Sequence, residues 1–260
     1  MIEIRSCSGF EELEACVRLE VETWGYDESD IIPRKAFLVA QKIGGQVFGA
    51  FDSEIAGLPQ RLVGFALSLP GVKSRHGAPP EPYLHSHMLG VREPYRNRGL
   101  GARLKREQRI EALSRGIRLM EWTFDPLEIK NAFLNIHKLG AVVRCYLENF
   151  YGASSSRLQA GLPTDRLLAE WWLDSPRTKA ALDGLPSAPQ SKKDSVERIV
   201  VPASIYEWKS SERDRERAHA VQLENRSRFQ DAFARGLAVT GFIRDAEGNG
   251  IFELGPLHEE

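Results

Sequence analysis

The sequence predicts an α/β fold in which helices cover the faces of a mixed sheet. Short segments of alternating apolar and polar residues are interleaved along the chain with segments whose apolar residues recur at helical spacing. Hydrophobic residues make up 42% of the 260 positions, which is enough to fill the core of one large domain or two smaller ones. The 35 Lys and Arg residues nearly balance the 36 Asp and Glu residues, so the chain lacks the positive excess of a nucleic-acid-binding protein.

The first 82 residues predict a strand, two helices, two strands and a loop. The opening stretch alternates, Ser8 precedes an acidic first turn of the first helix, and Gly25 marks the end of that helix. The apolar residues that recur at helical spacing along it are Phe10, Leu13, Val17 and Val21. The expected elements are a strand at 2–7, helices at 10–25 and 33–42, strands at 47–52 and 61–70, and a Pro- and Gly-rich loop at 70–82.

The middle of the chain predicts a strand, a loop and a helix, followed by a strand, a helix and a strand. The loop is basic and carries glycines, and a helical segment follows it. Asn131 is suited to cap the second helix. The expected elements are a strand at 83–91, the loop at 91–102, a helix at 101–116, a strand at 117–126, a short helix at 131–141 and a strand at 142–152.

The last part of the chain predicts two strands, a long charged helix and a hairpin. Ser210 or Ser211 would cap the helix, and Gly236 follows its end. A Gly-Asn-Gly turn would close the hairpin. The expected elements are strands at 166–173 and 198–205, an exposed connection at 185–197, the helix at 210–236 and the hairpin at 237–255.

The cysteine content and the hydropathy of the chain bear on its compartment. Cys7, Cys16 and Cys145 are too few and too scattered for a disulfide framework or a zinc site, so we expect reduced thiols. No apolar run approaches the ~18–20 residues that cross a bilayer, and the first residues lack the pattern of a signal peptide. The sequence therefore predicts a cytoplasmic protein that has neither a membrane nor a nucleic acid as its partner.

The loop at residues 96–102 has the composition of an anion-binding site. It lies between a predicted strand and a predicted helix, and Gly99 and Gly101 let the backbone approach a ligand closely. The start of the helix adds the positive end of its dipole, while Arg96 and Arg98 add charge and forked donors. A pyrophosphate fits this arrangement, although an ordinary glycine-rich turn explains the loop alone equally well.

In its context, the loop resembles that of the acyl-CoA-dependent N-acyltransferases of the GNAT superfamily. Arg96-x-x-Gly99-x-Gly101 stands where that family carries its Q/R-x-x-G-x-G/A pyrophosphate signature. Asn131-Ala132 followed by HKLGA at 137–141 is similar to the family's N-x-x-A…Y-x-K-x-G-F helix. The sequence contains neither a Rossmann G-x-G-x-x-G after the first strand nor a P-loop G-x-x-x-x-G-K-[ST]. The segment 161–173 also resembles a group of acetyltransferases with a C-terminal extension.

The resemblance implies a fold, a co-substrate and a set of binding residues. The fold would be a GNAT-like, mostly antiparallel sheet flanked by helices, with an acyl-CoA-binding domain at 1–152. A C-terminal α+β extension at 153–260 would pack on the acceptor side or complete it. The activity would be transfer of an acyl group, most simply acetyl from acetyl-CoA, to an amine of a small molecule or peptide. The residues that the resemblance assigns to the coenzyme are Leu89, Gly90, Val91, Arg96, Asn97, Arg98, Gly99, Leu100, Gly101, Ala102 and Asn131.

Acyl transfer requires the neutral form of the amine, so a proton acceptor is expected near the site. His85 and His87 stand two residues apart in a predicted strand and therefore share one face. His85 lies where one branch of the family has a glutamate base, and a histidine with its ordinary pKa of ~6.5 suits that role. Glu121 is the second candidate for the base. Asp125, on the same strand face, could act as a base, orient a histidine or cap the turn that follows. The H-x-H pair lacks a third ligand at a convincing spacing, so no metal is expected.

The family often returns a proton to the departing thiolate from a tyrosine, and Ile136 stands at that position here. His137, Tyr146 or Tyr151 could supply the proton instead, or the thiolate could leave unaided. The missing tyrosine also favours an alternative, a catalytically silent module that binds or senses acyl-CoA. An unrelated phosphate-ligand binder or hydrolase is the third reading. The sequence specifies neither the acceptor nor the oligomeric state.

Overall fold

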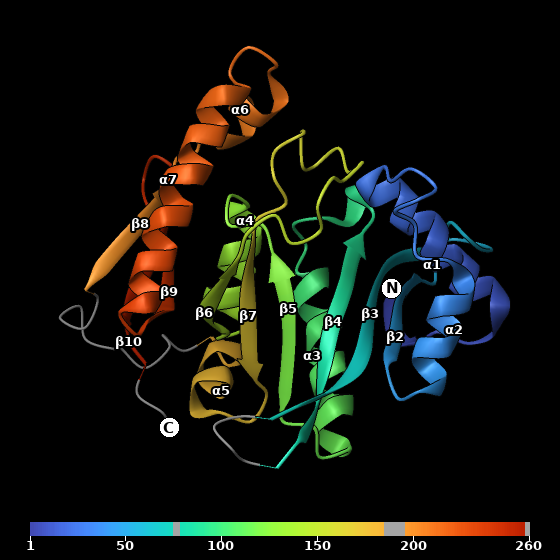
Figure 1. Cartoon of the computed structure of the whole chain (residues 1–260). Coiled ribbons are helices and arrows are strands. Elements are labelled where there is room, and N and C mark those ends of the chain that lie inside the picture. Colours follow the sequence, from blue (N-terminus) through green and yellow to red (C-terminus); the bar gives the residue numbers. More distant parts are fainter. Residues whose placement is uncertain (75–78, 185–195, 258–260) are drawn as a thin grey trace. The chain divides into compact units, whose positions relative to one another are not determined.

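The computed structural model describes residues 1–74, 79–184 and 196–257, and they form two compact units (Figure 1). One unit comprises Met1–Glu121 with Ser155–Leu158, and the other comprises Trp122–Ser154 with Gln159–Glu260. The boundary between the two units falls inside strand β5 (Leu119–Phe124). This follows from β6 (Val142–Leu147), which pairs with β7 and with β9, two strands of the C-terminal part.

The first unit is a sheet with a helical layer on each face. Its strands follow the order β1-β2-β3-β4-β5, in which the ladders from β1 to β4 are antiparallel and β4 and β5 are parallel. The remaining elements of this unit are β1 (Ile2–Ser6), α1 (Gly9–Trp24), α2 (Arg34–Lys42), β2 (Gln46–Asp52), β3 (Leu62–Lys73), β4 (Glu81–Val91), the 3₁₀ turn η1 (Glu93–Tyr95) and α3 (Leu100–Ser114). Apart from η1, each corresponds to an element that the sequence predicts.

Two separate apolar clusters hold these helices against the sheet. Leu13 of α1 and Phe37 of α2 pack with Phe65 on one face. Leu104 of α3 packs with Ala66 on the other face. Neighbouring residues of β3 therefore enter opposite clusters, as the pleat of a strand buried on both faces requires.

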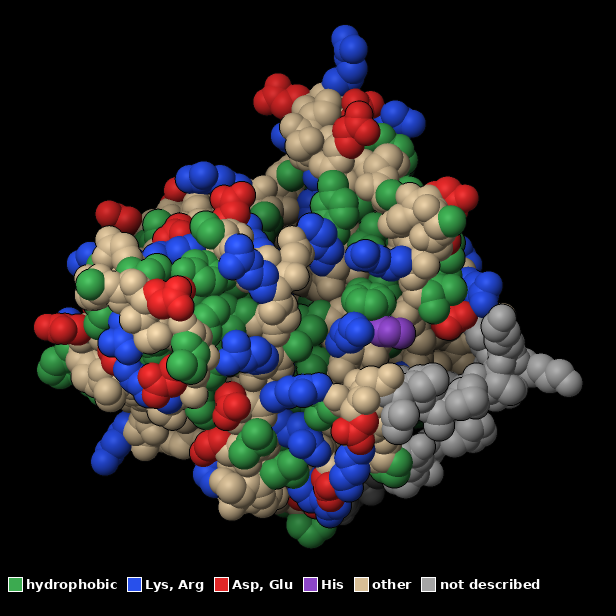
Figure 2. Space-filling view, turned by 180° about the vertical axis from the view of Figure 1, so that it is seen from behind, with side chains coloured by type: hydrophobic (Ala, Val, Ile, Leu, Met, Phe, Trp, Pro, Cys, Tyr) green, Lys and Arg blue, Asp and Glu red, His purple; other side chains and the backbone are tan. Residues whose placement is uncertain are grey.

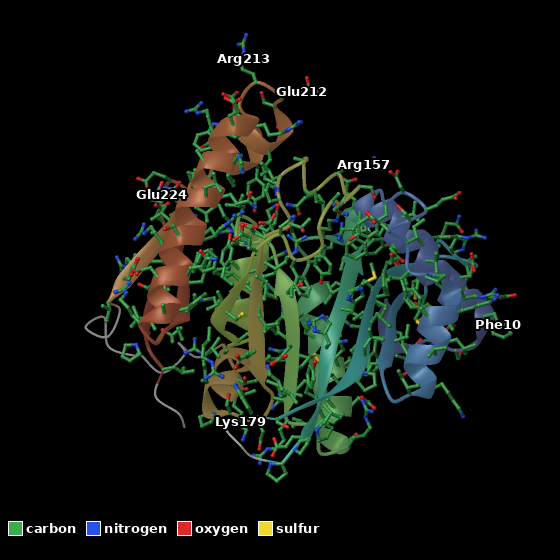
Figure 3. All side chains as sticks on the ribbon, in the orientation of Figure 1. Phe10, Arg157, Lys179, Glu212, Arg213 and Glu224 are labelled. Atoms are coloured by element: carbon green, nitrogen blue, oxygen red, sulfur yellow. The ribbon has the colours of Figure 1, made fainter. Side chains whose placement is uncertain are left out.

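The packing of α1 corrects the face that the sequence predicted. Leu13 is buried, but Phe10 is 61% exposed on the outside of the helix and Val21 is 38% exposed (Figure 3). The residues that the helix buries include Leu13, Cys16, Leu19 and Glu20. The predicted end of the helix is confirmed, because Gly25 adopts a φ of 65° and donates its N–H to the carbonyl of Val21 (2.8 Å).

The loop predicted at 70–82 is in large part a hairpin. Strand β3 continues to Lys73 and β4 begins at Glu81, and these two residues are register partners. Gly71 pairs with Tyr83, and a Cβ at Gly71 would come within 2.5 Å of the Tyr83 ring. Gly71, which contributed to the prediction of a loop, is therefore a strand residue. Because it has no side chain, it leaves the space that the Tyr83 ring occupies.

The second unit follows the strand order β5-β7-β6-β9-β10-β8, and the ladders that join β7, β6, β9, β10 and β8 are antiparallel. Phe229 packs edge-on against Phe252, with 5.1 Å between ring centroids, and joins a helix to this sheet. The remaining elements are α4 (Ile129–Ala132), the π-helical segment η2 (Phe133–Lys138), β7 (Arg166–Trp172), α5 (Pro176–Leu182), β8 (Glu197–Val201), α6 (Ile205–Ser210), α7 (Arg215–Ala234), β9 (Leu237–Arg244) and β10 (Gly250–Pro256). The predicted α/β class, with a mixed and mostly antiparallel sheet, is confirmed.

Two short helices of this unit differ from the prediction. Asn131 lies inside α4, which starts after Glu128, so Asn131 does not cap the helix. Helix α5 was not predicted. The signals of this helix are nevertheless present, since Pro176 is its first residue and the Ser175 hydroxyl accepts the N–H of Thr178 at 3.1 Å.

The long charged helix predicted at 210–236 corresponds to α7 alone, which starts later than predicted. The strand predicted at 198–205 ends at Val201, and its last residue, Ile205, begins α6. Helix α6 ends at Ser210, and α7 begins only after Asp214, so neither predicted serine caps the longer helix. Residues 185–195 of the predicted connection lie outside the described residues. Within the described ranges, no helix is both long enough and apolar enough to cross a membrane. On the face shown in Figure 2, basic and acidic side chains are interspersed, in keeping with their near-equal numbers.

Candidate functional site

The predicted anion-binding loop connects β4 to α3 in the first unit. After η1 the chain passes through Asn97, with a φ of 61°, and Gly99, with a φ of 75°, and then enters the helix. The first helical bond runs from the Arg103 N–H to the Gly99 carbonyl (3.1 Å). The amides that precede Arg103 at the helix start have no intrahelical acceptor. Left-handed residues beside a helix start form an anion-binding nest of N–H groups.

Side chains from β2 and from the loop itself hold this segment in place. The Tyr95 hydroxyl donates to Asp52 Oδ2 at 2.7 Å, and this bond lowers the pKa of the Asp52 carboxyl. Arg96 donates through Nε to the Val91 carbonyl at 2.9 Å. The Arg98 guanidinium lies 5.7 Å from the centre of the Tyr95 ring. Arg96 therefore ties the loop to the end of β4, while Arg98 remains exposed on the loop surface.

The parallel ladder with β5 covers only part of one backbone edge of β4. The register pairs with β5 are Leu84↔Met120 and His85↔Glu121, whereas β4 continues to Val91. On the other edge, the three residues predicted to meet the coenzyme pair with β3, as Leu89↔Ala66, Gly90↔Phe65 and Val91↔Gly64. A Cβ at Gly90 would lie 3.1 Å from both the Trp24 and the Phe65 rings, so glycine is needed there for packing.

The two histidines lie together on β4, as predicted. Their ring centroids are 6.0 Å apart, and both side chains are half-buried. Leu67 pairs with Met88 and Ser68 pairs with Ser86, so His87 is the extra residue of a β-bulge. Burial, and then the charges of His87 and Lys105, lower the pKa of His85 to about 4. Burial also lowers the pKa of His87. The value near 6.5 expected from the sequence is therefore wrong for His85.

Glu121 is the register partner of His85 on β5, and it is 4% exposed. Its carboxylate is ion-paired with the Lys73 ammonium at the far end of β3. A Glu121 base would first have to exchange this partner, so the structure favours His85 as the first candidate.

The other predicted site residues belong to the second unit. Asn131 is exposed on α4. His137 is exposed and stacks on Phe133, with ring centroids 4.5 Å apart, and burial followed by the charge of Lys138 lowers its pKa. Ile136, at the position of the family's tyrosine, is 1% exposed and belongs to the core.

The two tyrosines named as alternative acids already have partners. The Tyr146 hydroxyl donates to Asp165 at 2.6 Å, and burial raises its pKa. The Tyr151 hydroxyl is hydrogen-bonded to Thr123 at 2.9 Å. Asp125 caps a turn as predicted, because its side chain accepts the Leu127 N–H at 2.8 Å.

Two buried ionisable groups of the first unit were not predicted from the sequence. Lys105 of α3 is 3% exposed and donates to Ser86 at 2.7 Å. Glu20 of α1 is fully buried, and burial raises its pKa to about 7. Lys105 stands beside Leu104 and three residues before Gln108, on the face of α3 that is buried.

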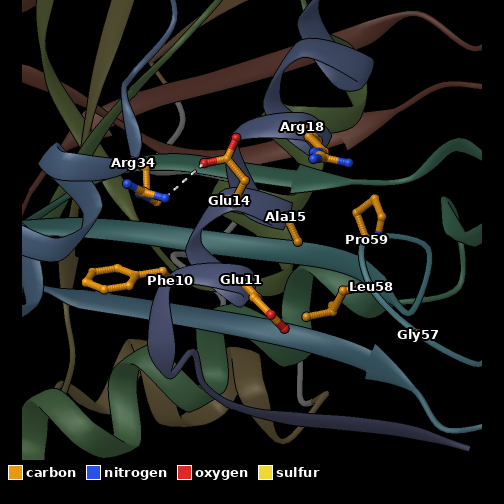
Figure 4. Close-up of a pocket in the computed structure, with 9 residues that line it drawn as sticks. All are labelled: Phe10, Glu11, Glu14, Ala15, Arg18, Arg34, Gly57, Leu58 and Pro59. Atoms are coloured by element: carbon orange, nitrogen blue, oxygen red, sulfur yellow. Dashed lines mark ion pairs between the residues drawn. The ribbon is translucent and has the colours of Figure 1, made fainter.

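A groove of about 580 Å³ on the outside of α1 is separate from the loop and from β4 (Figure 4). Arg34 crosses it between Glu14, at 3.8 Å, and the ring of Phe10, at 5.1 Å. The other residues that line it are Glu11, Ala15, Arg18, Gly57, Leu58 and Pro59. In the part of the chain that the structure describes, no three His, Cys, Asp or Glu side chains are grouped to hold a metal ion.

Comparisons with known proteins identify the fold. No family model matches the sequence, and no curated protein matches it either. Arabidopsis thaliana NAA60 in complex with a bisubstrate analogue superposes with a TM-score of 0.51 and 18% identity, over 66% of this chain and 98% of that chain. NAA60 with acetyl-CoA gives a TM-score of 0.51 and 16% identity, over 66% and 99%. The ribosomal-protein-S18-alanine N-acetyltransferase from Escherichia coli superposes with a TM-score of 0.49 and 15% identity, over 67% of this chain and 96% of that chain. The likeness to NAA60 confirms the predicted GNAT-like fold.

Proposed function

We propose that this protein is an acyl-CoA-dependent N-acyltransferase. The observation that carries the proposal is the exposed loop between β4 and α3, where left-handed Asn97 and Gly99 precede a 15-residue helix and alternate with Arg96 and Arg98. NAA60, which shares the fold, was solved with acetyl-CoA and with a bisubstrate analogue. That likeness supports acetyl-CoA as the co-substrate and an amine as the acceptor.

The residues of the loop fit a pyrophosphate. A Cβ added at Gly99 would meet no described atom within 4 Å, so the space in front of this backbone is open to a ligand. Arg98 supplies an exposed cation, and the start of α3 supplies N–H groups and the positive end of a dipole. The backbone edge at Leu89–Val91 would hold the amide groups of an extended arm.

Bound acyl-CoA would supply a thioester, whose carbonyl carbon forms a C–N bond with the amine while its C–S bond breaks. His85 takes the proton from the amine nitrogen, directly or through one water. With a pKa of about 4, His85 is neutral at pH 7 and always able to accept a proton. It is also a weak base, so it acts as the C–N bond forms, when the nitrogen becomes much more acidic than a free ammonium.

The sulfur leaving group needs less acid–base catalysis than the attacking nitrogen. A thiol has an ordinary pKa of ~8.5, so a thiolate leaves readily near neutral pH. We therefore propose that the thiolate leaves without a proton donor, which is one of the alternatives that Ile136 leaves open. The acceptor in this proposal is a primary amine of a small molecule or a peptide.

Two glycines of α3 allow a matched test of the loop. Gly99 precedes the helix and Gly116 follows it, and both are left-handed, with φ of 75° and 78°, and open around the missing Cβ. Alanine at either position therefore introduces a similar strain of ~1–2 kcal/mol. We expect Gly99→Ala to weaken CoA binding at least ~10-fold by calorimetry, and Gly116→Ala to leave it within ~2-fold. Equal affinities in the two variants would refute the loop assignment.

Activity separates the enzyme from the silent binding module. The expected result is release of free thiol from acetyl-CoA when the protein is offered a panel of amines. CoA binding without thiol release from any amine would favour the silent module, and absence of CoA binding would refute both.

A further inference from the structure

A buried row of polar side chains crosses the α3 face of the first sheet. Gln46, Ser68 and Ser86 stand side by side on β2, β3 and β4, since Gln46↔Ser68 and Ser68↔Ser86 are register pairs. Lys105 and Gln108 of α3 face this row. All five side chains are at most 4% exposed. We call these five residues the polar seam.

Hydrogen bonds join the polar seam from α3 to all three strands. Lys105 donates to the Ser86 hydroxyl at 2.7 Å, and that hydroxyl donates to Gln108 Oε1 at 3.1 Å. Gln46 donates to the Gln108 carbonyl at 2.8 Å, and the Ser68 hydroxyl donates to Gln46 Oε1 at 3.0 Å. Among the described residues, Gln108 Nε2 is buried without a partner.

Lys105 is the member of the polar seam whose burial is unfavourable for folding. An ammonium removed from water is penalised by several kcal/mol, and apolar side chains of similar volume are often neutral or stabilising in its place. Burial lowers the pKa of Lys105 well below its ordinary value, in agreement with this penalty. A feature that is unfavourable for folding needs a functional explanation. The position of Ser86 on β4 supplies one.

Ser86 stands between the two histidines at the bulge of β4. Because His87 is the extra residue of the bulge, the backbone at 85–87 has fewer ladder bonds than a regular strand. The Ser86 side chain points to α3, where two hydrogen bonds hold it. The same contacts join the histidine segment to α3, the helix that carries the anion-binding loop.

We propose that Lys105 is a positioning residue, which fixes Ser86 and thereby holds His85 where it acts on the amine. The proposal rests on the function proposed above. It assigns no contact between Lys105 and either substrate.

The test compares Lys105→Met with Ser86→Ala in the full chain. Lys105→Met removes both the charge and the bond to Ser86, whereas Ser86→Ala keeps the charge and removes the bonds of the hydroxyl to Lys105 and to Gln108. Both should lower kcat about 10-fold or more, because a displaced catalytic group loses its alignment, while the KM for acetyl-CoA stays within ~2-fold. Lys42→Met removes an exposed lysine from α2 and should change nothing.

Titration of the His85 ring by NMR adds a readout that does not need turnover. The charged and titratable groups near His85 are His87 on β4, Glu121 on β5, which is paired with Lys73 of β3, and Lys105 on α3, whose charge lowers the pKa of His85. Lys105→Met should raise the pKa of His85, since a nearby positive charge is removed, and Ser86→Ala should raise it less. The melting temperature of Lys105→Met should equal or exceed that of the wild type.

The outcomes separate this inference from the proposed function. A Lys105→Met enzyme with wild-type kcat overturns the positioning role, whether or not the His85 titration moves. A fall in kcat that matches a fall in melting temperature, with an unchanged His85 titration, overturns it as well and leaves Lys105 as a core residue. Absence of CoA binding and thiol release in the wild-type chain is instead a failure of the proposed function.

Discussion

His85 should remain neutral from pH 8 to about pH 5, and its replacement by alanine should lower kcat about 100-fold. Burial lowers the pKa of this half-buried ring to about 4, against an ordinary value of 6.5. General bases contribute ~10²–10⁴ in rate, and a weak base belongs at the lower end of that range. Affinity for CoA should stay within ~2-fold of wild type, because His85 is not assigned to the coenzyme.

The same shift has a consequence for stability. The pKa of His85 is lower in the folded chain, so between pH 6.5 and about 4 the unfolded chain binds more protons. The free energy of unfolding therefore falls as the pH falls through this window. His85→Ala removes one source of this dependence, so its melting temperature should fall less than that of the wild type between pH 6.5 and pH 4.5.

Two measurements check these expectations. Thiol release gives kcat, and NMR gives the midpoint of the His85 ring signals, which are assigned by their loss in His85→Ala. For kcat, His87→Ala is the matched control, because it removes the neighbouring ring and leaves His85 in place. A wild-type midpoint near 6.5 would refute the argument from burial, and wild-type kcat in His85→Ala would refute the assignment of the base.

Two further substitutions extend these tests. Glu20→Gln should raise the melting temperature more at pH 8 than at pH 5. Burial raises the pKa of Glu20 from 4.5 to about 7, so the wild type loses stability as the pH rises through this window. An equal gain in melting temperature at both pH values would contradict this expectation. Glu121→Gln should keep kcat within ~3-fold and leave the midpoint of the His85 titration unchanged, because the Glu121 carboxylate is paired with Lys73. A ~100-fold loss of kcat would instead assign the role of base to Glu121.

Local patterns explain why much of the first unit could be predicted. Gly25 and the pair Gly44-Gly45 mark helix ends, because glycine adopts the positive φ that a C-cap needs. The loop before α3 is visible for the same reason, since Gly99 adopts a positive φ. His85 and His87 are predictably on one face, because two residues is the period of a strand. These features depend on residues near one another in the sequence.

Long-range pairing explains what the sequence did not reveal. The Ser155 N–H and hydroxyl both donate to Asp30, at 2.9 and 2.6 Å, and this contact places Ser155–Leu158 in the first unit. Nothing local to either residue indicates the other. The bulge at His87 depends in the same way on the register between β3 and β4. The burial of Lys105 depends on Ser86, which belongs to another element. From the sequence alone, a lysine on a charged helix is expected at the surface.

The spacing of features along β4 also bears on which phosphate ligand fits. His85 precedes Val91 by six residues in one extended strand, which corresponds to about 20 Å at ~3.3 Å per residue. The anion-binding loop begins beyond Val91, where Arg96 is bonded to the Val91 carbonyl. A ligand that has its phosphate at the loop and its reacting group at His85 must therefore be long and extended along β4. A free phosphate or a simple nucleotide is too short for both ends, whereas acyl-CoA joins its pyrophosphate to its thioester through an arm with two amide groups. The available backbone edge of β4 beyond His85 offers such amides hydrogen-bonding partners along the way, so the strand itself favours an acyl-CoA over a shorter phosphate ligand.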